Sequence, residues 1–153
     1  MSNVFDDDAL ARIELQIDSW LAEQRRNDSS IVAIDRGEDE EIRWFVRMRG
    51  EEKEFTTIWL TLGQRTLKYE TYVMPAPEEN AETLYDTVLR RNDNLVGVHF
   101  SIGAEDAIFL RGELPLHALT EPELDRIIGT VYATVERAFS SLIRIGFASR
   151  FVD

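Results

Sequence analysis

The side chains that could perform acid–base or metal chemistry in this chain are two histidines and many carboxylates, but their spacing suits neither task. His99 and His117, the only histidines, have no carboxylate near them at a zinc-ligand spacing. The carboxylates form strings such as 6–8 and 38–41, whereas acid–base catalysis needs two carboxyl groups in one cleft. Glycine-rich phosphate loops, calcium loops and the serine-hydrolase elbow do not occur in the sequence. We therefore predict no catalytic residues, no metal site and no cofactor.

Aromatic and arginine side chains are better suited to binding. Phe45 and Trp59 fall on strand faces otherwise lined by Arg or Thr, and Tyr72 lies in the strand that follows. Such aromatics mark either a peptide-binding or dimer surface, or a face that a helix covers. Arg90 and Arg91 end a predicted helix, where they either clamp a phosphate or carboxylate, or complement the helix dipole and pair with nearby aspartates. These five residues are the candidate partner-binding set.

Composition limits the classes of partner. The net charge of −12 gives a surface that repels nucleic-acid phosphates and anionic lipid, so we predict neither nucleic-acid nor membrane binding. Residues 42–72 are the exception, with six bases and four acids. The acidic surface serves solubility or faces a basic partner. We expect a cytoplasmic protein, because there is no cysteine, no secretory signal and no run approaching the ~20 apolar residues of a membrane span.

The sequence predicts three helices, running from about Asp7 to Arg26, from just after Pro77 to about Arg91, and from Thr120 to about Leu142. Asp6 caps the first, and Asn92 or Asn94 is expected to end the second in the left-handed conformation. Thr120 and Glu123 predict a capping box at the start of the third. Gly129, inside that helix, suggests close approach of another backbone.

Apolar and polar residues alternate along the remaining segments, which is typical of antiparallel strands with one buried face. The expected strands are 31–34, 42–49, 55–62, 67–74, 95–102 and 107–114, and Pro115 ends the last. We predict one α+β domain over residues 1–153. Its antiparallel sheet has about five strands with flanking helices, in the order α-β-β-β-α-β-β-α.

The segment Leu67–Leu116 resembles the YbjN family of bacterial proteins, which are regarded as sensory transduction regulators. The residues that carry the resemblance are Thr66-Leu67-Lys68, Val73-Met74-Pro75-Ala76-Pro77, Asn80, Leu84-Tyr85, Val88-Leu89-Arg90-Arg91-Asn92, Val98-His99-Phe100-Ser101-Ile102 and Ile108 to Leu116. The order of helices and strands is similar over most of the chain. The family in turn looks like the type III secretion chaperone fold, an antiparallel sheet flanked by helices.

The resemblance implies a non-enzymatic protein-binding domain, because the family has no accepted catalytic residues to carry over. It implies a chaperone-like or regulatory role in which the sheet face or an edge engages segments of an unidentified protein partner, and a possible homodimer. The alternative is a small-molecule-binding regulator, with a pocket between the sheet and the first or last helix where Arg43, Arg47, Arg90 and Arg91 hold an anion. An enzyme of unknown class is the third hypothesis.

Overall fold

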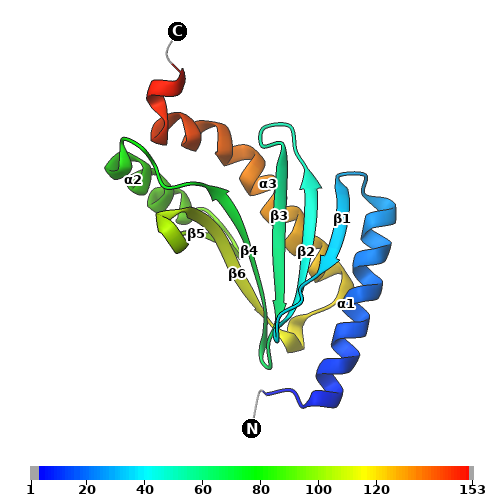
Figure 1. Ribbon diagram of the computed structural model, residues 1–153. Coiled ribbons are helices and arrows are strands. Elements are labelled where there is room, and N and C mark those ends of the chain that lie inside the picture. Colours follow the sequence, from blue (N-terminus) through cyan, green and yellow to red (C-terminus); the bar gives the residue numbers. More distant parts are fainter. Residues whose placement is uncertain (1–3, 152–153) are drawn as a thin grey trace.

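The computed structural model describes residues 4–151, which form six strands and three long helices (Figure 1). The helices are α1 (Asp7–Asn27), α2 (Ala81–Asn92) and α3 (Glu121–Gly146), with 3-10 turns at Ala104–Asp106, Leu116–Ala118 and Ala148–Phe151. The strands are β1 (Ile31–Arg36), β2 (Ile42–Arg49), β3 (Phe55–Leu62), β4 (Thr66–Met74), β5 (His99–Ile102) and β6 (Ile108–Pro115).

All strand pairs are antiparallel, in the order β1-β2-β3-β4-β6-β5. Strands β1 to β4 form a meander joined by short turns, and β6 then lies between β4 and β5 (Figure 1). The predicted α+β class with one antiparallel sheet is confirmed. The observed order, α-β-β-β-β-α-β-β-α, has one strand more before the second helix than the predicted order.

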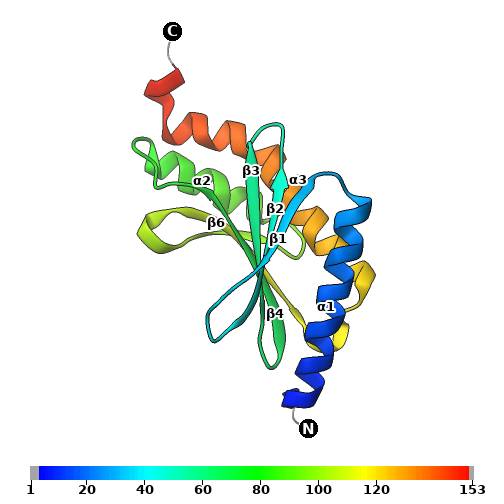
Figure 2. The ribbon, with the colours of Figure 1, turned by 45° about the vertical axis from the view of Figure 1, so that its right-hand side comes forward.

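One face of the sheet packs against α1 and α3, and we call it the covered face. Figure 2 shows α3 running across the far side of the strands. The covered face consists of alternate residues, which are buried: Trp44, Val46 and Met48 on β2, Ile58, Leu60 and Leu62 on β3, and Leu67, Tyr69 and Val73 on β4. Burying each apolar side chain stabilises the fold by ~1.5–3 kcal/mol relative to exposure, so this face contains the core.

Polar contacts fix the two covering helices on that face. The Trp44 indole N–H donates to Asp18 of α1 at 2.7 Å. On α3, the Glu136 carboxylate accepts the backbone N–H groups of Glu51 and Glu52, at 2.9 and 2.8 Å. Gly50 is needed beside this contact, because a Cβ there would lie 2.4 Å from the Lys53 carbonyl oxygen and 1.6 Å from a Glu136 oxygen. The turn between β2 and β3 is therefore tied directly to α3.

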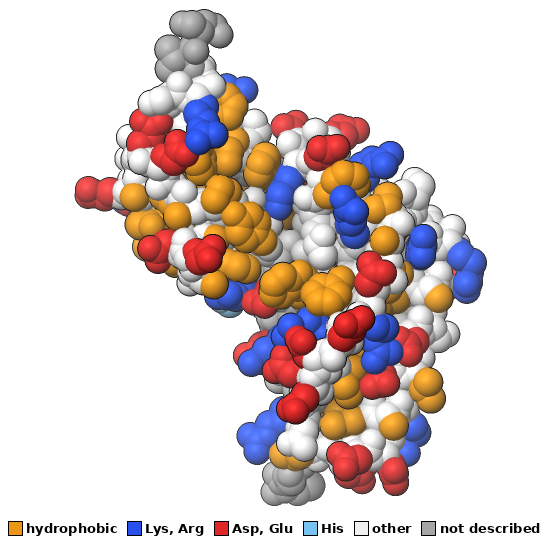
Figure 3. All heavy atoms as spheres, in the orientation of Figure 1, with side chains coloured by type: hydrophobic (Ala, Val, Ile, Leu, Met, Phe, Trp, Pro, Cys, Tyr) orange, Lys and Arg blue, Asp and Glu red, His pale blue; other side chains and the backbone are white. Residues whose placement is uncertain are grey.

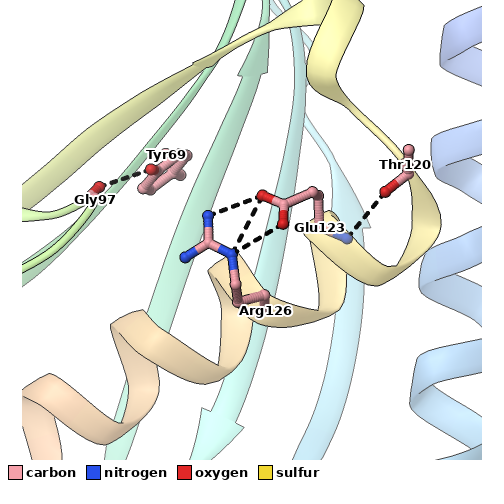
Figure 4. Close-up of polar contacts among 5 residues, drawn as sticks. All are labelled: Tyr69, Gly97, Thr120, Glu123 and Arg126. Atoms are coloured by element: carbon pink, nitrogen blue, oxygen red, sulfur yellow. Dashed lines mark hydrogen bonds and ion pairs between the residues drawn. The ribbon is translucent and has the colours of Figure 1, made fainter.

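Tyr69 fixes the loop that leads from α2 to β5. Its hydroxyl donates to the Gly97 carbonyl at 2.7 Å (Figure 4), and burial raises its pKa. Gly112 lies in register with Tyr69 on β6, where a Cβ would come within 2.2 Å of the Gly97 oxygen. Gly97 itself has a φ of +78°, a backbone conformation that glycine adopts without strain. This contact ends the loop, so β5 begins at His99 rather than at the predicted residue 95.

Three local predictions about helices were wrong or only half right. Thr120 caps α3 by accepting the Glu123 N–H, but the Glu123 carboxylate pairs with Arg126 instead of completing the box (Figure 4). This pairing lowers the pKa of Glu123. A Cβ added to Gly129 would meet no atom within 4 Å, so no second backbone approaches this residue. Neither Asn92 nor Asn94 is left-handed; the helix-flanking asparagine with a positive φ is Asn80, which is why α2 starts only at Ala81.

Candidate protein-binding face

No helix among the described residues 4–151 covers the opposite side of the sheet, which we call the open face (Figures 1 and 3). Phe45 and Trp59 lie on it and are partly exposed, so the sequence-based choice between an open and a covered position is settled in favour of the open one. In Figure 3 hydrophobic side chains gather across the middle of this face, with Lys and Arg side chains beside them.

One row of paired residues crosses the open face on all six strands. The pairs run Asp35 to Phe45, Phe45 to Trp59, Trp59 to Glu70, Glu70 to Arg111, and Arg111 to His99. The Phe45 and Trp59 rings meet edge to face, with centroids 5.9 Å apart. Arg111 donates to Glu70 at 2.7 Å. The row therefore has an aromatic pair on β2 and β3 and an ion pair on β4 and β6.

Three arginines of β2 lie on the open face around the aromatic side chains. The Arg47 guanidinium is 3.9 Å from the centre of the Phe55 ring, and that of Arg49 is 5.7 Å from it. Arg43 pairs with acidic residues of the β1–β2 loop, whereas Arg47 and Arg49 form no ion pair with any described residue. Stacked, unpaired arginines are ready to meet a carboxylate of a partner, since the guanidinium edge stays free to donate.

The charge of the open face differs from that of the whole chain. Its strands present five bases, Arg43, Arg47, Arg49, Lys68 and Arg111, against three acids, Asp35, Glu70 and Glu113. The chain as a whole carries a net charge of −12. Arg43 and Arg111 are paired with acids, so the positive charge that is free to attract a carboxylate lies chiefly at Arg47 and Arg49.

Tyr72 marks one border of the open face. It is 41% exposed and meets Phe109 edge to face at 5.7 Å. Phe109 is only 7% exposed, because Gly103 lies against its ring, where a Cβ would come within 2.4 Å. The Lys53 ammonium donates to the Tyr72 carbonyl at 2.6 Å, and burial lowers the pKa of Lys53 to about 8. The aromatic surface is thus bounded by a half-buried lysine.

A shallow depression lies next to the aromatic pair, over β4, β6 and β5. It has a volume of about 290 Å³, and Lys68, Glu70, His99, Arg111 and Glu113 line it. No group of three or more His, Asp or Glu residues within 4–151 is placed to hold a metal ion. Charged groups of both signs beside an aromatic patch suit recognition of a polypeptide with mixed side chains.

Comparison with known proteins places this fold in a family. The model for "YbjN: Putative bacterial sensory transduction regulator" matches residues 16–144. The chain belongs to the YbjN family. The match runs from the middle of α1 to almost the end of α3, so the whole sheet and both of its faces are parts of the family domain. The resemblance based on Leu67–Leu116 is confirmed.

The YbjN domain has curated relatives in mycobacteria. It is similar to the uncharacterized proteins Mb0497 of Mycobacterium bovis and Rv0487 of Mycobacterium tuberculosis, each 35% identical over 104 residues that cover 68% of this chain and 57% of the relative. The uncharacterized protein ML2442 of Mycobacterium leprae is 32% identical over 108 residues, 71% of this chain and 59% of the relative. The chain thus spans a little over half the length of these relatives.

Both edges of the YbjN sheet are partly occupied by side chains of the same chain. At β5, the Asn92 side chain donates to the Phe100 carbonyl at 3.1 Å and accepts the Phe100 N–H at 2.6 Å. At β1, Arg25 of α1 donates to the Val32 carbonyl at 3.2 Å. Satisfied edge groups are poor templates for another strand, so the geometry favours the open face over an edge as a binding surface.

The structure does not bring all the candidate residues together. Phe45, Trp59 and Tyr72 share the open face, whereas Arg90 and Arg91 lie on α2, which packs against α3 and β5. Arg90 is 79% exposed and pairs with Asp86 one helical turn away at 2.9 Å, as one sequence-based alternative predicted. Arg43 and Arg47 of β2 lie four strands from β5, so the four arginines proposed for one anion site cannot meet in one pocket.

Sequence reasoning did not predict the positions or contacts of three residues on or near the sheet. Phe55 follows the same alternation as Phe45 and Trp59, and that signal was sufficient to place it on the open face. Lys53 was assigned to a turn, and the sequence does not show that its side chain reaches the Tyr72 carbonyl of β4. Asn92 was interpreted as a helix cap, whereas its side chain binds the Phe100 backbone, a contact that depends on how the chain returns from α2 to β5.

Within residues 4–151, every helix is too short or too polar to span a bilayer.

Proposed function

We propose that this YbjN family member is a non-enzymatic regulatory module that binds a segment of a partner protein on the open face, in the cytoplasm. The observation that supports the proposal is the uncovered aromatic and basic surface formed by Phe45, Phe55, Trp59 and the arginines of β2. Aromatic and arginine side chains contribute most to the energy of protein–protein interfaces.

The segment that this surface fits carries apolar side chains and carboxylates. Apolar side chains would cover the edge-to-face pair of Phe45 and Trp59, and each such aromatic ring buries ~150–250 Å² when it is fully enclosed. Carboxylates would meet Arg47 and Arg49, which have no acidic partner among the described residues. The mixed charges of the depression over β4, β6 and β5 would fix the direction of the segment.

Selection from a random peptide library displayed on phage tests this proposal. The full chain is the bait, and the variant Phe45→Ala/Trp59→Ala is the counter-selection. We expect enriched peptides that combine acidic with aromatic or aliphatic residues and that lose at least about tenfold in affinity for the variant. The control Leu15→Ala/Val96→Ala removes two exposed apolar side chains elsewhere and should bind normally. Failure to enrich any sequence, or equal binding to the variant, would contradict the proposal.

We also predict a homodimer, which would let the association of two copies regulate binding. Side chains already occupy backbone groups at both sheet edges, so we expect two copies to meet through α2, where Leu89 is 67% exposed. Light scattering at high protein concentration checks this prediction, and a mass that remains that of one chain would contradict it.

The second candidate function is a small-molecule-binding regulator. The observation that favours it is a cavity of about 360 Å³ between α2, β5 and the last helix. A thermal-shift screen separates the two functions, because a small ligand that binds the folded state raises the melting temperature without any peptide.

A further inference from the structure

The cavity at the junction of α2, β5 and α3 has a polar rim and an apolar floor. Its volume of about 360 Å³ falls in the range of small-molecule pockets. Leu95, Phe100 and Ala138 supply most of the floor, beside Asn94 and the buried Thr134, and Phe100 is only 4% exposed. Arg91 of α2 and Arg137 of α3 line the same cavity. Two cationic side chains from different helices thus border one apolar hollow.

Neither arginine is neutralised by the surrounding protein. Arg91 donates one hydrogen bond to Ser141 Oγ at 2.8 Å, and Arg137 donates from Nε to the Ala133 carbonyl of its own helix at 3.3 Å. No ion pair involves either residue in the described part of the chain, and no Asp or Glu from that part lines the cavity. A guanidinium has five N–H donors, so most of the donors at the rim have no protein acceptor among residues 4–151.

We propose that this cavity binds a small organic anion, a phosphate or carboxylate on a compact apolar body. The anionic group would lie between Arg91 and Arg137, which can bind it in the bidentate manner of guanidinium groups. The apolar body would lie on Leu95 and Phe100. An inorganic anion would leave that floor unused, and a neutral apolar molecule would leave the arginines unused.

The remaining contacts place the ligand where α2, α3 and β5 meet. Phe100 forms the floor of the cavity and pairs with Leu110 of β6, and its backbone is held by Asn92 at the end of α2. A ligand there would join α2, α3 and the β5 edge. The inference does not depend on the proposed peptide binding, since the cavity residues are not on the open face.

Titration of the full chain with phenyl phosphate, followed by amide NMR, tests the inference. We expect shifts at Leu95, Phe100 and Ala138, and a loss of about tenfold or more in affinity in Arg91→Gln and in Arg137→Gln. Arg90→Gln is the matched control, because it removes the same charge from the neighbouring position, where the side chain is 79% exposed. Its affinity should stay within about twofold of the parent chain.

The comparison arms are benzoate and inorganic phosphate. If benzoate binds as tightly as phenyl phosphate, the site accepts carboxylates as well as phosphates. If benzoate binds more weakly, the site prefers phosphates. Both results support the inference. Inorganic phosphate binding as tightly as phenyl phosphate overturns it, because the floor would then contribute nothing. Absence of shifts up to about 10 mM phenyl phosphate, or equal losses in Arg90→Gln and Arg91→Gln, also overturns it.

Discussion

Trp44 and Trp59 lie on opposite sides of the same sheet, and their surroundings differ in kind. Trp44 is 1% exposed, and its indole N–H is bound to Asp18 of a covering helix. Trp59 is partly exposed, stands edge to face against Phe45, and has the Arg43 guanidinium 5.8 Å from its ring centre. The covered face is completed by the chain's own helices. The open face has aromatic and basic groups of the kinds that partners use, and no helix within residues 4–151 covers them.

The difference teaches that one alternating pattern can encode two tasks. Along β2, even-numbered residues such as Val46 lie in the core, and odd-numbered residues such as Arg47 lie on the open face. A surface strand needs only polar residues for solubility, so Phe45, Phe55 and Trp59 on the open face call for a separate explanation. Binding of a partner segment supplies one.

The largest expected effect contrasts neighbouring residues of β3. Leu60→Ala removes a fully buried side chain and should lower the free energy of unfolding by about 2–5 kcal/mol. Trp59→Ala, on the open face, should lower it by less, because part of the ring is already exposed in the folded state and its removal leaves no enclosed cavity. Urea denaturation measures both. Equal losses would mean that the open face is a second core and would remove the basis of the comparison.

A second contrast concerns the edge of β5. Asn92→Ala leaves the Phe100 N–H and carbonyl without their side-chain partner, so we expect a loss of about 1–3 kcal/mol and more self-association through the freed edge. Asn94→Ala is the control, since its side chain makes no such contact. Urea denaturation and light scattering check the two parts. An unchanged unfolding curve would show that Asn92 does not protect the edge.

Gly129 tests the outer surface of the covering helix. Because it is exposed and nothing approaches it, Gly129→Ala should stabilise the protein by about 1 kcal/mol through helix propensity alone. Gly112→Ala should do the opposite, because its Cβ would collide with the Gly97 carbonyl and the Tyr69 ring. Thermal unfolding measures both signs. A destabilised Gly129→Ala variant would indicate a contact on that surface.

The smallest expected effect is a pH dependence at the border of the open face. Burial lowers the pKa of Lys53 from 10.5 to about 8, so above about pH 8 the folded state releases a proton that the unfolded state keeps. Stability should therefore rise from about pH 8 toward pH 10, and Lys53→Met should lose this slope. Above that range the raised pKa of Tyr69 and of Tyr72 acts in the opposite direction. A parent slope equal to that of the variant would contradict the assignment.

Much of the fold followed from local patterns in the sequence. Alternation placed 42–49 and 55–62 with the observed bounds, and Asp6 correctly predicted the start of α1. Two of the failures, at Asn92 and at the start of β5, depend on where distant segments meet. Asn92 contacts β5, and β5 starts late because Tyr69 holds Gly97. Alternation likewise showed that Phe45 and Trp59 share a face, but which face the helices cover is a tertiary property.

The most direct test of the central claim is amide NMR mapping of a library-selected acidic peptide on the parent chain. If the open face binds the segment, shifts should concentrate on β2, β3 and β4, with intermolecular contacts to the Trp59 ring and none to that of buried Trp44. Shifts confined to the outer edges of β1 or β5, or to α2, would contradict the claim that the uncovered side of the sheet is the binding surface.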